Sequence, residues 1–219
     1  MIFQWLLFPL VIFYQSLFEL INYFIHSYGW SLLLLSFATT IITKPINSYI
    51  EEIVDRERTI KNILSPQIEK INKQYKGRIR HEAISRLYYR YRYHPLLAIR
   101  SSLGLFVQLP FLLGAYWMLS DYSPLKEESF LFIKDLFLAD GLGPFNINIL
   151  PICMTLVNIY TIYISFDQQK ERNQLTVIAI IFFILLYSAP SSLLLYWTTN
   201  NLLSLSKALQ NRRKKNVYL

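Results

Sequence analysis

The chain has 219 residues, of which 53% are hydrophobic, 16% aromatic and 16% charged, and its mean hydropathy is +0.30. Soluble domains are typically about 45–50% apolar and about 25% charged. The composition therefore excludes a disordered chain and argues against an ordinary soluble enzyme. A single cysteine excludes a disulfide framework, and three histidines argue against a multi-histidine metal centre.

The N-terminal stretch 1–27 is predicted to form an amphipathic helix. Its polar residues Gln15, Glu19, Asn22 and His26 fall at helical spacing, so they form one stripe opposite a broad apolar face. This pattern is typical of a helix that lies in the membrane interface, and a sixth membrane span is the alternative. A cleaved signal peptide is not expected, because no basic segment precedes the apolar run and no small-residue cleavage site follows it.

Five further segments are predicted to cross a membrane, because each approaches the roughly 20 mostly apolar residues that a span needs. These segments are 28–45, 100–119, 147–166, 174–189 and 190–209. The last of them turns polar from Thr198 onward but stays uncharged until Lys207. Pro190 separates the last two spans with almost no loop, which predicts a tight helical hairpin.

The basic residues indicate how these spans are oriented. Twelve of the 22 Lys and Arg residues lie within 51–100, and five more lie from Lys207 onward. Basic residues near span ends favour the cytoplasmic side. The rule places 51–100, the short loop 167–174 and the basic tail 210–219 inside, and the loop 120–146 outside. We therefore expect a multi-pass protein of the plasma (inner) membrane with a cytoplasmic C-terminus.

Residues 46–95 are too charged to span and are predicted to form a cytoplasmic antiparallel helical hairpin. Gly77 is the expected turn, and His94-Pro95 is the expected end. The second arm is basic and rich in tyrosine, which suits contact with RNA or anionic lipid; a solvated face is the alternative. In the outer loop 120–146 we expect a short interfacial element around Leu136.

Polar side chains inside the predicted spans are the candidate lining of a hydrophilic groove, since such residues usually face the protein interior or a water-filled cavity. This candidate set consists of Ser36, Thr39, Thr40, Thr43, Gln108, Asn158, Thr161, Thr198 and Asn201, with Ser204 as a further member. The alternative is that they form hydrogen bonds between helices. Lys44 follows Thr40 by four residues on the same face and adds a positive charge there, unless it only extends to the interface.

No enzyme is predicted. The sequence contains no glycine-rich phosphate loop, no His-Glu-x-x-His and no Gly-x-Ser-x-Gly motif. Cys153 lies inside a predicted span and is expected to be a small packing residue. We expect no catalytic residue, cofactor, metal or small-molecule substrate.

The order of several short motifs resembles the YidC-type membrane protein insertases and their organellar relatives, over about residues 25–210. The motifs are His26-Ser27-Tyr28-Gly29-Trp30-Ser31, Pro45, Leu64-Ser65-Pro66-Gln67-Ile68-Glu69-Lys70-Ile71, Tyr75-Lys76-Gly77, Gln108-Leu109-Pro110-Phe111, Tyr116-Trp117-Met118-Leu119, Ile149-Leu150-Pro151-Ile152, Pro190-Ser191-Ser192, Leu195-Tyr196-Trp197 and Asn201-Leu202.

The resemblance implies an all-α integral membrane protein with five transmembrane helices around a polar groove, a cytoplasmic hairpin and an N-terminal interfacial helix. It implies insertion of client segments by lateral release into lipid without nucleotide hydrolysis, and it adds Trp197 to the groove residues beside Gln108. The implied partners are nascent membrane proteins and membrane lipids, with the ribosome or the translocon as further candidates. The chain departs from the family at Thr40, where many members carry an arginine, and between Pro95 and Gln108, where it lacks the family's glycine-rich segment.

Two rival functions remain beside insertion. The first is a scaffold or assembly subunit of another membrane complex, motivated by the missing arginine. The second is a lipid-transit protein in which the groove passes headgroups between the leaflets.

Overall fold

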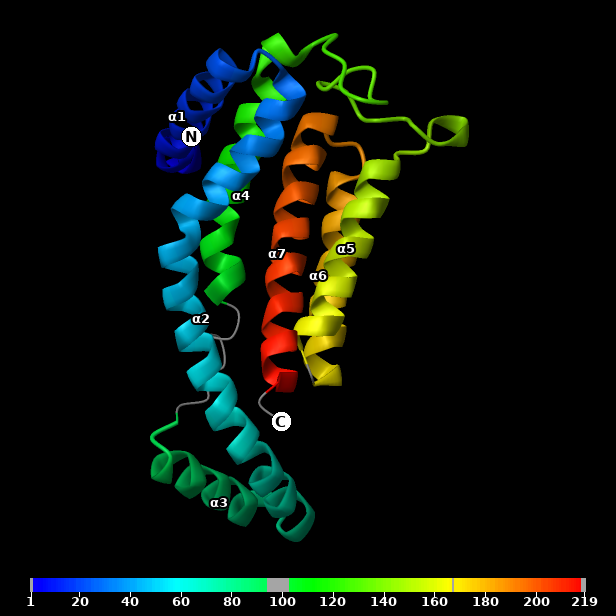
Figure 1. The fold of residues 1–219 in the computed structure, drawn as a ribbon. Helices are drawn as coiled ribbons and strands as arrows, with labels where there is room; N and C mark the ends of the chain where they lie inside the picture. Colours follow the sequence, from blue (N-terminus) through cyan, green and yellow to red (C-terminus); the bar gives the residue numbers. More distant parts are fainter. Residues whose placement is uncertain (1, 94–102, 167, 218–219) are drawn as a thin grey trace. The chain divides into compact units, whose positions relative to one another are not determined.

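The computed structural model describes residues 2–93, 103–166 and 168–217, and within them the chain is helical apart from loops and one isolated bridge between Phe130 and Ile133 (Figure 1). The elements are α1 (Ile2–Ile25), α2 (Tyr28–Gln74), α3 (Gly77–Arg90), α4 (Leu103–Asp121), η2 (Ser123–Leu125), η3 (Pro144–Asn146), α5 (Ile149–Ser165), α6 (Gln169–Leu186) and α7 (Ser191–Val217). The chain folds as two compact units, 1–42 with 112–219, and 43–111. An all-helical fold was predicted, and the described residues agree with it.

In the first unit, α1 ends at Ile25 and the chain turns through His26, which has a left-handed φ of 54°. The Ser31 hydroxyl fixes this turn, because its oxygen lies 2.8 Å from the Ser27 carbonyl oxygen and 3.1 Å from Oδ1 of Asn22. Of the predicted polar stripe, Gln15 and Glu19 are exposed. The turn thus holds the end of α1 beside the start of α2.

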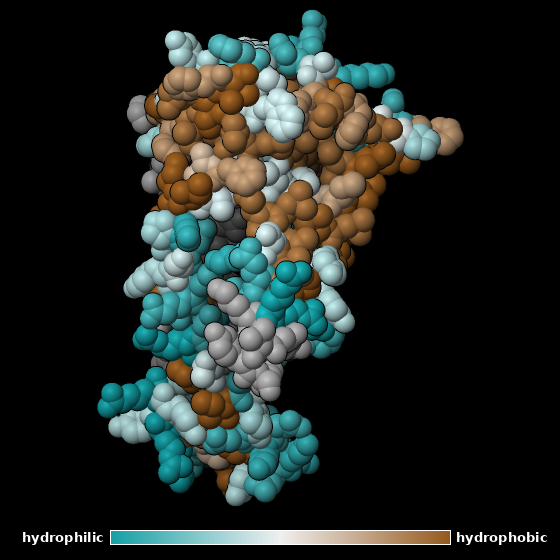
Figure 2. All heavy atoms as spheres, viewed as in Figure 1, coloured by the Kyte–Doolittle hydropathy of each residue, from teal (hydrophilic) through white to brown (hydrophobic). Residues whose placement is uncertain are grey.

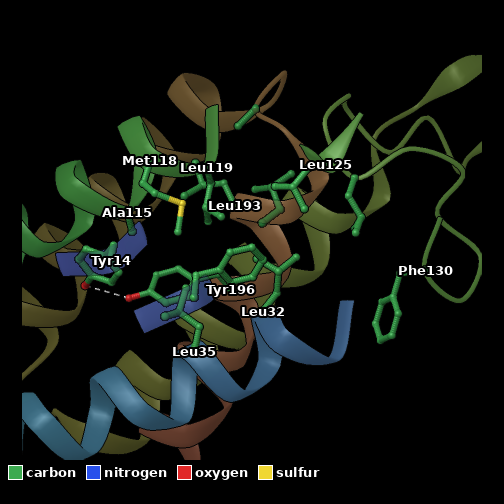
Figure 3. Close-up of a cluster of buried hydrophobic side chains, with 14 of the residues drawn as sticks. Tyr14, Leu32, Leu35, Ala115, Met118, Leu119, Leu125, Phe130, Leu193 and Tyr196 are labelled. Atoms are coloured by element: carbon green, nitrogen blue, oxygen red, sulfur yellow. Dashed lines mark hydrogen bonds between the residues drawn. The ribbon is translucent and has the colours of Figure 1, made fainter. Parts of the chain in front are cut away.

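The core of the first unit is apolar and is built from α1, α2, α4, α7 and the loop between α4 and α5, with Met154 of α5 and Leu186 of α6 (Figure 3). Its largest fully buried side chains are Tyr14, Phe18, Leu32, Leu35, Leu119, Leu125, Ile133, Leu136, Met154, Leu193 and Leu194. α5 packs along both α6 and α7 (Figure 1). The predicted tight hairpin at Pro190 is present, since α6 ends at Leu186 and α7 begins at Ser191.

The loop between α4 and α5 packs into this core. Phe130, Ile133 and Leu136 are buried there. The loop also satisfies the start of α7, because the backbone N–H of Ser191 donates to the carbonyl of Leu138 at 2.8 Å, and that of Ser192 donates to Leu136 at 2.9 Å. Helix N-termini leave such N–H groups without helical partners. The loop therefore caps the N-terminus of α7 as well as connecting α4 to α5.

α2 differs from the predicted division at residue 45, because it continues as one helix of 47 residues through Pro45 and Pro66. A proline inside a helix removes one backbone hydrogen bond and kinks the helix without having to end it. The two compact units nevertheless divide between Ile42 and Thr43, one turn before Pro45. The change in sequence character near residue 45 therefore marks a boundary between packing units rather than a helix end.

The second unit contains the predicted hairpin, with the turn at Gly77 between α2 and α3. Gly77 has a φ of +59°, a conformation that glycine adopts without steric cost. Leu64 and Leu87 are buried, and Nε2 of Gln67 donates to the Tyr91 hydroxyl at 3.1 Å. These contacts hold α3 against α2. The predicted end at His94-Pro95 lies outside the described residues.

The surface of the first unit is largely apolar on the face seen in Figure 2. Among the described residues, two stretches are long and apolar enough to cross a membrane, Leu7–Ile25 and part of Tyr28–Gln74, and Ile149–Ser165 is a shorter apolar helix. The number of spans, their orientation and the interfacial position of α1 remain predictions.

Candidate functional site

The predicted polar residues of α2 share one helix face. Thr39 and Thr40 follow Ser36 by three and four residues, and residues at these spacings are neighbours on a helix surface. In the first unit this face meets α7 at Tyr196 and Asn200. We call these five residues the α2–α7 polar row. Some residues of this row are buried, and the others are accessible to solvent.

Ser36, Thr39 and Tyr196 form the buried part of the row and bind one another. Tyr196 also bonds to the buried Tyr14 of α1, which lies outside the row (Figure 3). The Ser36 hydroxyl donates to the Tyr196 carbonyl oxygen at 2.7 Å. The Tyr196 hydroxyl lies 3.1 Å from that of Tyr14 and 3.3 Å from Oγ1 of Thr39. Ser36 and Thr39 therefore form hydrogen bonds between helices, which was the alternative to their lining a groove.

Neither tyrosine of this cluster was among the predicted site residues. Tyr14 lies in an apolar helix and Tyr196 in an aromatic motif, so neither interrupts its span with an obviously polar residue. The available signal was chemical: a buried tyrosine usually finds a partner for its hydroxyl. The two rings also meet edge to face, with centroids 6.0 Å apart.

Thr40 and Asn200 form the accessible part of the row. Thr40 is exposed, and its Oγ1 lies 2.8 Å from the Ser36 carbonyl oxygen and 3.1 Å from Oδ1 of Asn200. Close by on α7, Oγ1 of Thr198 and Nδ2 of Asn201 are buried and have no hydrogen-bond partner in the described part of the chain. Buried polar atoms left unpaired are unfavourable, and ordered water is their usual partner in proteins.

The α5 candidates have different surroundings. The Thr161 hydroxyl donates to the carbonyl of Val157 in its own helix at 2.8 Å, and Asn158 is half-buried. Trp197 of α7 packs edge to face against Phe182 of α6, with centroids 5.4 Å apart. Thr161 is thus satisfied locally, and the Trp197 ring takes part in apolar packing between α6 and α7.

Three predicted residues belong to the second unit. Nδ2 of Asn47 donates to Oγ1 of Thr43 at 3.4 Å, and Lys44 is exposed. Gln108 lies in α4, but its side chain is outside the described part of the structure. The site that can be described therefore consists of residues from α1, α2 and α7 of the first unit.

A cleft of about 650 Å³ lies elsewhere in the first unit, between α1 and the C-terminal end of α4. Its polar lining includes Gln15, Glu19 and Asp121, and Nε2 of Gln15 donates to Glu19 at 2.9 Å. Burial, together with the nearby Glu19 carboxylate, raises the pKa of Tyr122 at its edge. These lining residues are distinct from the predicted groove set.

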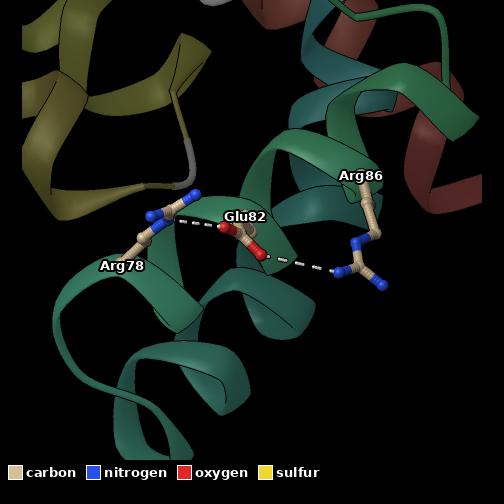
Figure 4. A network of polar contacts seen from close by, with 3 residues as sticks. All are labelled: Arg78, Glu82 and Arg86. Carbon is tan, nitrogen blue, oxygen red and sulfur yellow. Dashed lines mark hydrogen bonds and ion pairs between the residues drawn. The ribbon is translucent and has the colours of Figure 1, made fainter.

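The hairpin surface is charged. In α3, Glu82 lies between two arginines, 3.0 Å from Arg78 and 3.7 Å from Arg86 (Figure 4). In α2, the exposed Lys73 lowers the pKa of Glu69 through a contact of 2.7 Å. Exposed ion pairs of this kind contribute little to stability. The surface of the hairpin is therefore charged and exposed to solvent. Its contact with RNA or anionic lipid remains a prediction.

Comparison with known proteins gives one consistent result. Residues 20–217 match the family model described as 60Kd inner membrane protein. The membrane protein insertase YidC of Parabacteroides distasonis is 28% identical over 163 residues, which are 66% of this chain and 24% of that protein. The membrane protein insertase YidC of Clostridium tetani is 31% identical over 115 residues, which are 51% of this chain and 48% of that protein.

A solved structure agrees with these sequence matches. The crystal structure of an active YidC insertase with the first transmembrane domain resolved superposes with a TM-score of 0.60 at 25% identity. The match covers 94% of this chain and 46% of that one. The chain therefore spans about half the length, or less, of the relatives that it matches.

Proposed function

We propose that the chain, which belongs to the 60Kd inner membrane protein family of YidC-type insertases, inserts client segments into the membrane and releases them laterally into lipid without nucleotide hydrolysis. The family confirms the resemblance that the sequence predicted. The two curated relatives are named as insertases, which supports a non-enzymatic role. Its proposed partners are membrane-protein clients and lipids.

The observation that carries this proposal is the pair of unpaired polar atoms on α7. Thr198 Oγ1 and Asn201 Nδ2 are buried without protein partners in the described structure, and Thr40 with Asn200 provides an accessible polar edge on the same helix pair. We infer that water solvates these groups. A polar client tail then meets less hydrocarbon, in which every unsatisfied backbone group costs several kcal/mol.

The buried part of the α2–α7 polar row supports a groove with one closed end. Along α2 the bonded residues Ser36 and Thr39 precede the exposed Thr40, and along α7 the buried Tyr196 precedes Asn200 and Asn201. With the predicted orientation, the bonded residues lie toward the outside and the unsatisfied ones toward the cytoplasm. Such a groove admits a client from the cytoplasm and stops water before the outer surface.

The test removes the unsatisfied polar groups. We expect Thr198→Val and Asn201→Leu to change the free energy of unfolding little, because neither substitution breaks a hydrogen bond within the described part of the protein. We expect the same variants to lower, several-fold, the insertion of a small single-span client with an acidic tail into liposomes that contain only this protein.

Ser120→Ala is the matched control, because Ser120 of α4 also carries a buried hydroxyl without a partner in the described structure but lies outside the predicted groove set. Its insertion activity should equal that of the parent. The proposal is wrong if Thr198→Val and Asn201→Leu insert clients normally. It is also wrong if the control loses as much activity as they do.

The residue at position 40 favours one rival function. Threonine stands where many insertases carry an arginine, which is the motive for a scaffold role in another membrane complex. Failure of the purified protein to insert every client tested would support that role. Labelled lipid in the same liposomes tests lipid transit, since an insertase should leave it unequilibrated between the leaflets.

A further inference from the structure

The loop before α5 presents a fully exposed aromatic side chain in a constrained backbone. Phe145, in η3, is 100% exposed, and both Phe145 and Asn146 have a φ of 58°. The left-handed region is unfavourable for residues that carry a Cβ, and two consecutive non-glycine residues rarely adopt it. Such conformations persist only where the surrounding structure enforces them.

Hydrogen bonds at the base of this loop supply that enforcement. Oδ2 of Asp140 accepts from the backbone N–H groups of Ile149 and Leu150 at the start of α5, at 2.6 and 3.2 Å. The side chain of Asn148 accepts from the N–H of Gly141 at 3.0 Å and donates to the carbonyl of Tyr187 at 2.8 Å. The loop is therefore fixed to the start of α5 and to the end of α6.

A second link closes the loop itself. The N–H of Gly143 donates to the carbonyl of Ile147 at 2.8 Å, across the turn that contains Phe145. A Cβ at position 143 would lie 2.9 Å from that of Ile147, so the backbone approach requires glycine. Phe145 thus belongs to a rigid loop, and the segment that contains η3 projects away from the bundle before the start of α5 (Figure 1).

α5, which follows the loop of Phe145, carries an exposed apolar stripe. Ile149, Leu156, Tyr160 and Tyr163 are all exposed, and their spacing of seven, four and three residues puts them on one helix face. If α5 spans the membrane, as the proposed function requires, this stripe faces lipid. Phe145 then lies at the outer end of a lipid-facing surface.

We propose that Phe145 inserts into the boundary between headgroups and acyl chains of the outer leaflet, so that residues 140–150 form a rigid anchor for the outer end of α5. Apolar aromatic side chains on a protein surface bind this boundary by burying their rings. Lipid is the occupant that the α5 stripe indicates, because residues 141–165 contain no charged side chain and the apolar residues Phe145, Ile147 and Ile149 are exposed. The inference rests on the membrane placement given under the proposed function.

Site-directed spin labelling tests the anchor. Cys153, the only cysteine, is replaced by serine, and a nitroxide is attached to Phe145→Cys in liposomes. We expect oxygen to relax this label several-fold more strongly than a water-soluble nickel chelate, as in lipid. A label at Glu127→Cys, which is also exposed with a φ of 62°, is the aqueous control and should show the reverse.

Two results would overturn the proposed anchor at Phe145. A label at 145 that the nickel chelate relaxes as strongly as the label at 127 overturns the anchor, because the label is then in water. Low accessibility to both reagents also overturns it, because the label is then buried against protein. As an independent measurement on a less altered side chain, Phe145→Trp fluorescence should be quenched by brominated lipid in a variant whose other four tryptophans are replaced by phenylalanine.

A third label separates the anchor from the proposed function. Leu156→Cys reports whether the α5 stripe faces lipid. Lipid accessibility at 156 without lipid accessibility at 145 removes the anchor and leaves the proposed placement standing. Water accessibility at both sites removes the membrane placement of α5 and the anchor together.

Discussion

At the scale of single residues, the buried hydroxyls of Tyr14 and Tyr196 depend on each other. Tyr196→Phe leaves the Tyr14 hydroxyl buried without the partner at 3.1 Å, and an unsatisfied buried group costs about 1–3 kcal/mol. Tyr14→Phe should cost less, because the Tyr196 hydroxyl keeps Oγ1 of Thr39 at 3.3 Å. We therefore expect Tyr196→Phe to be the more destabilising change in detergent unfolding.

The double variant tests this dependence. Tyr14→Phe combined with Tyr196→Phe should be no less stable than Tyr196→Phe alone, since the second substitution removes the orphaned hydroxyl. Strictly additive losses would mean that the two side chains do not interact.

Lys44 carries a separate prediction. It is exposed and lies four residues after Thr40 along α2. If its charge attracts acidic client tails, Lys44→Glu should lower their insertion more than Lys44→Ala does, and raised salt should reduce the difference. Clients with neutral tails are the control, because their insertion should not change in either variant. If both variants insert clients with acidic tails as well as the parent does, the Lys44 charge has no role in client capture.

Only some residues of the site could be predicted from the sequence. Ser36 and Thr39 were found because a hydroxyl interrupts an apolar run, but their burial against Tyr196 depends on which helices pack together. The periodicity of one helix carries no information on its neighbour. The same limit explains why Tyr14 was missed.

At the scale of elements, the loop between α4 and α5 packs against α2 at Gly29. A Cβ at position 29 would occupy the space of the Phe130 ring, which also packs edge to face on Trp30. Gly29→Ala should therefore destabilise the fold, by about 1–3 kcal/mol for overpacking, although alanine favours the helix by up to about 1 kcal/mol. Thermal unfolding in detergent measures the balance.

Phe130→Ala provides the control for this prediction. Once the ring is removed, Gly29→Ala should become neutral or stabilising, because only the helix preference of alanine remains. A destabilisation of the same size in both backgrounds would show that something other than the Phe130 ring opposes the methyl group.

The helices themselves were more predictable than their ends. Apolar runs of about 20 residues indicated α4, α5, α6 and α7, and Gly77 indicated the hairpin turn. The continuity of α2 through Pro45 was not foreseen, since a proline after a basic residue is also typical of a helix end. Whether a proline ends a helix or only kinks it depends on the tertiary contacts of the residues around it. These contacts cannot be predicted from the local sequence.

At the scale of the whole molecule, the sequence predicted one membrane domain with a hairpin, and the structure contains two packing units. The second unit includes 103–111 of α4 as well as the hairpin, so the boundary divides a predicted span. Hydropathy follows the membrane, whereas packing units follow side-chain contacts. The two descriptions need not share boundaries.

The distribution of charge predicts how the molecule sits in the membrane. The hairpin 46–95 holds half of the Lys and Arg residues and should stay in the cytoplasm, whereas the loop 120–146 has more acidic than basic residues and should lie outside. In a Cys153→Ser background, a membrane-impermeant maleimide should label Lys134→Cys in intact cells, because this loop residue is exposed. It should label His81→Cys, exposed on α3, only after the cells are lysed.

The pair of sites makes this experiment internally controlled. Both side chains are exposed, so labelling of both after lysis shows that each thiol reacts and that only the membrane protects one of them. Labelling of His81→Cys in intact cells, with Lys134→Cys protected, would invert the orientation and put the unsatisfied groups of α7 toward the outside. The groove would then open away from the cytoplasm, where it could not receive newly made clients.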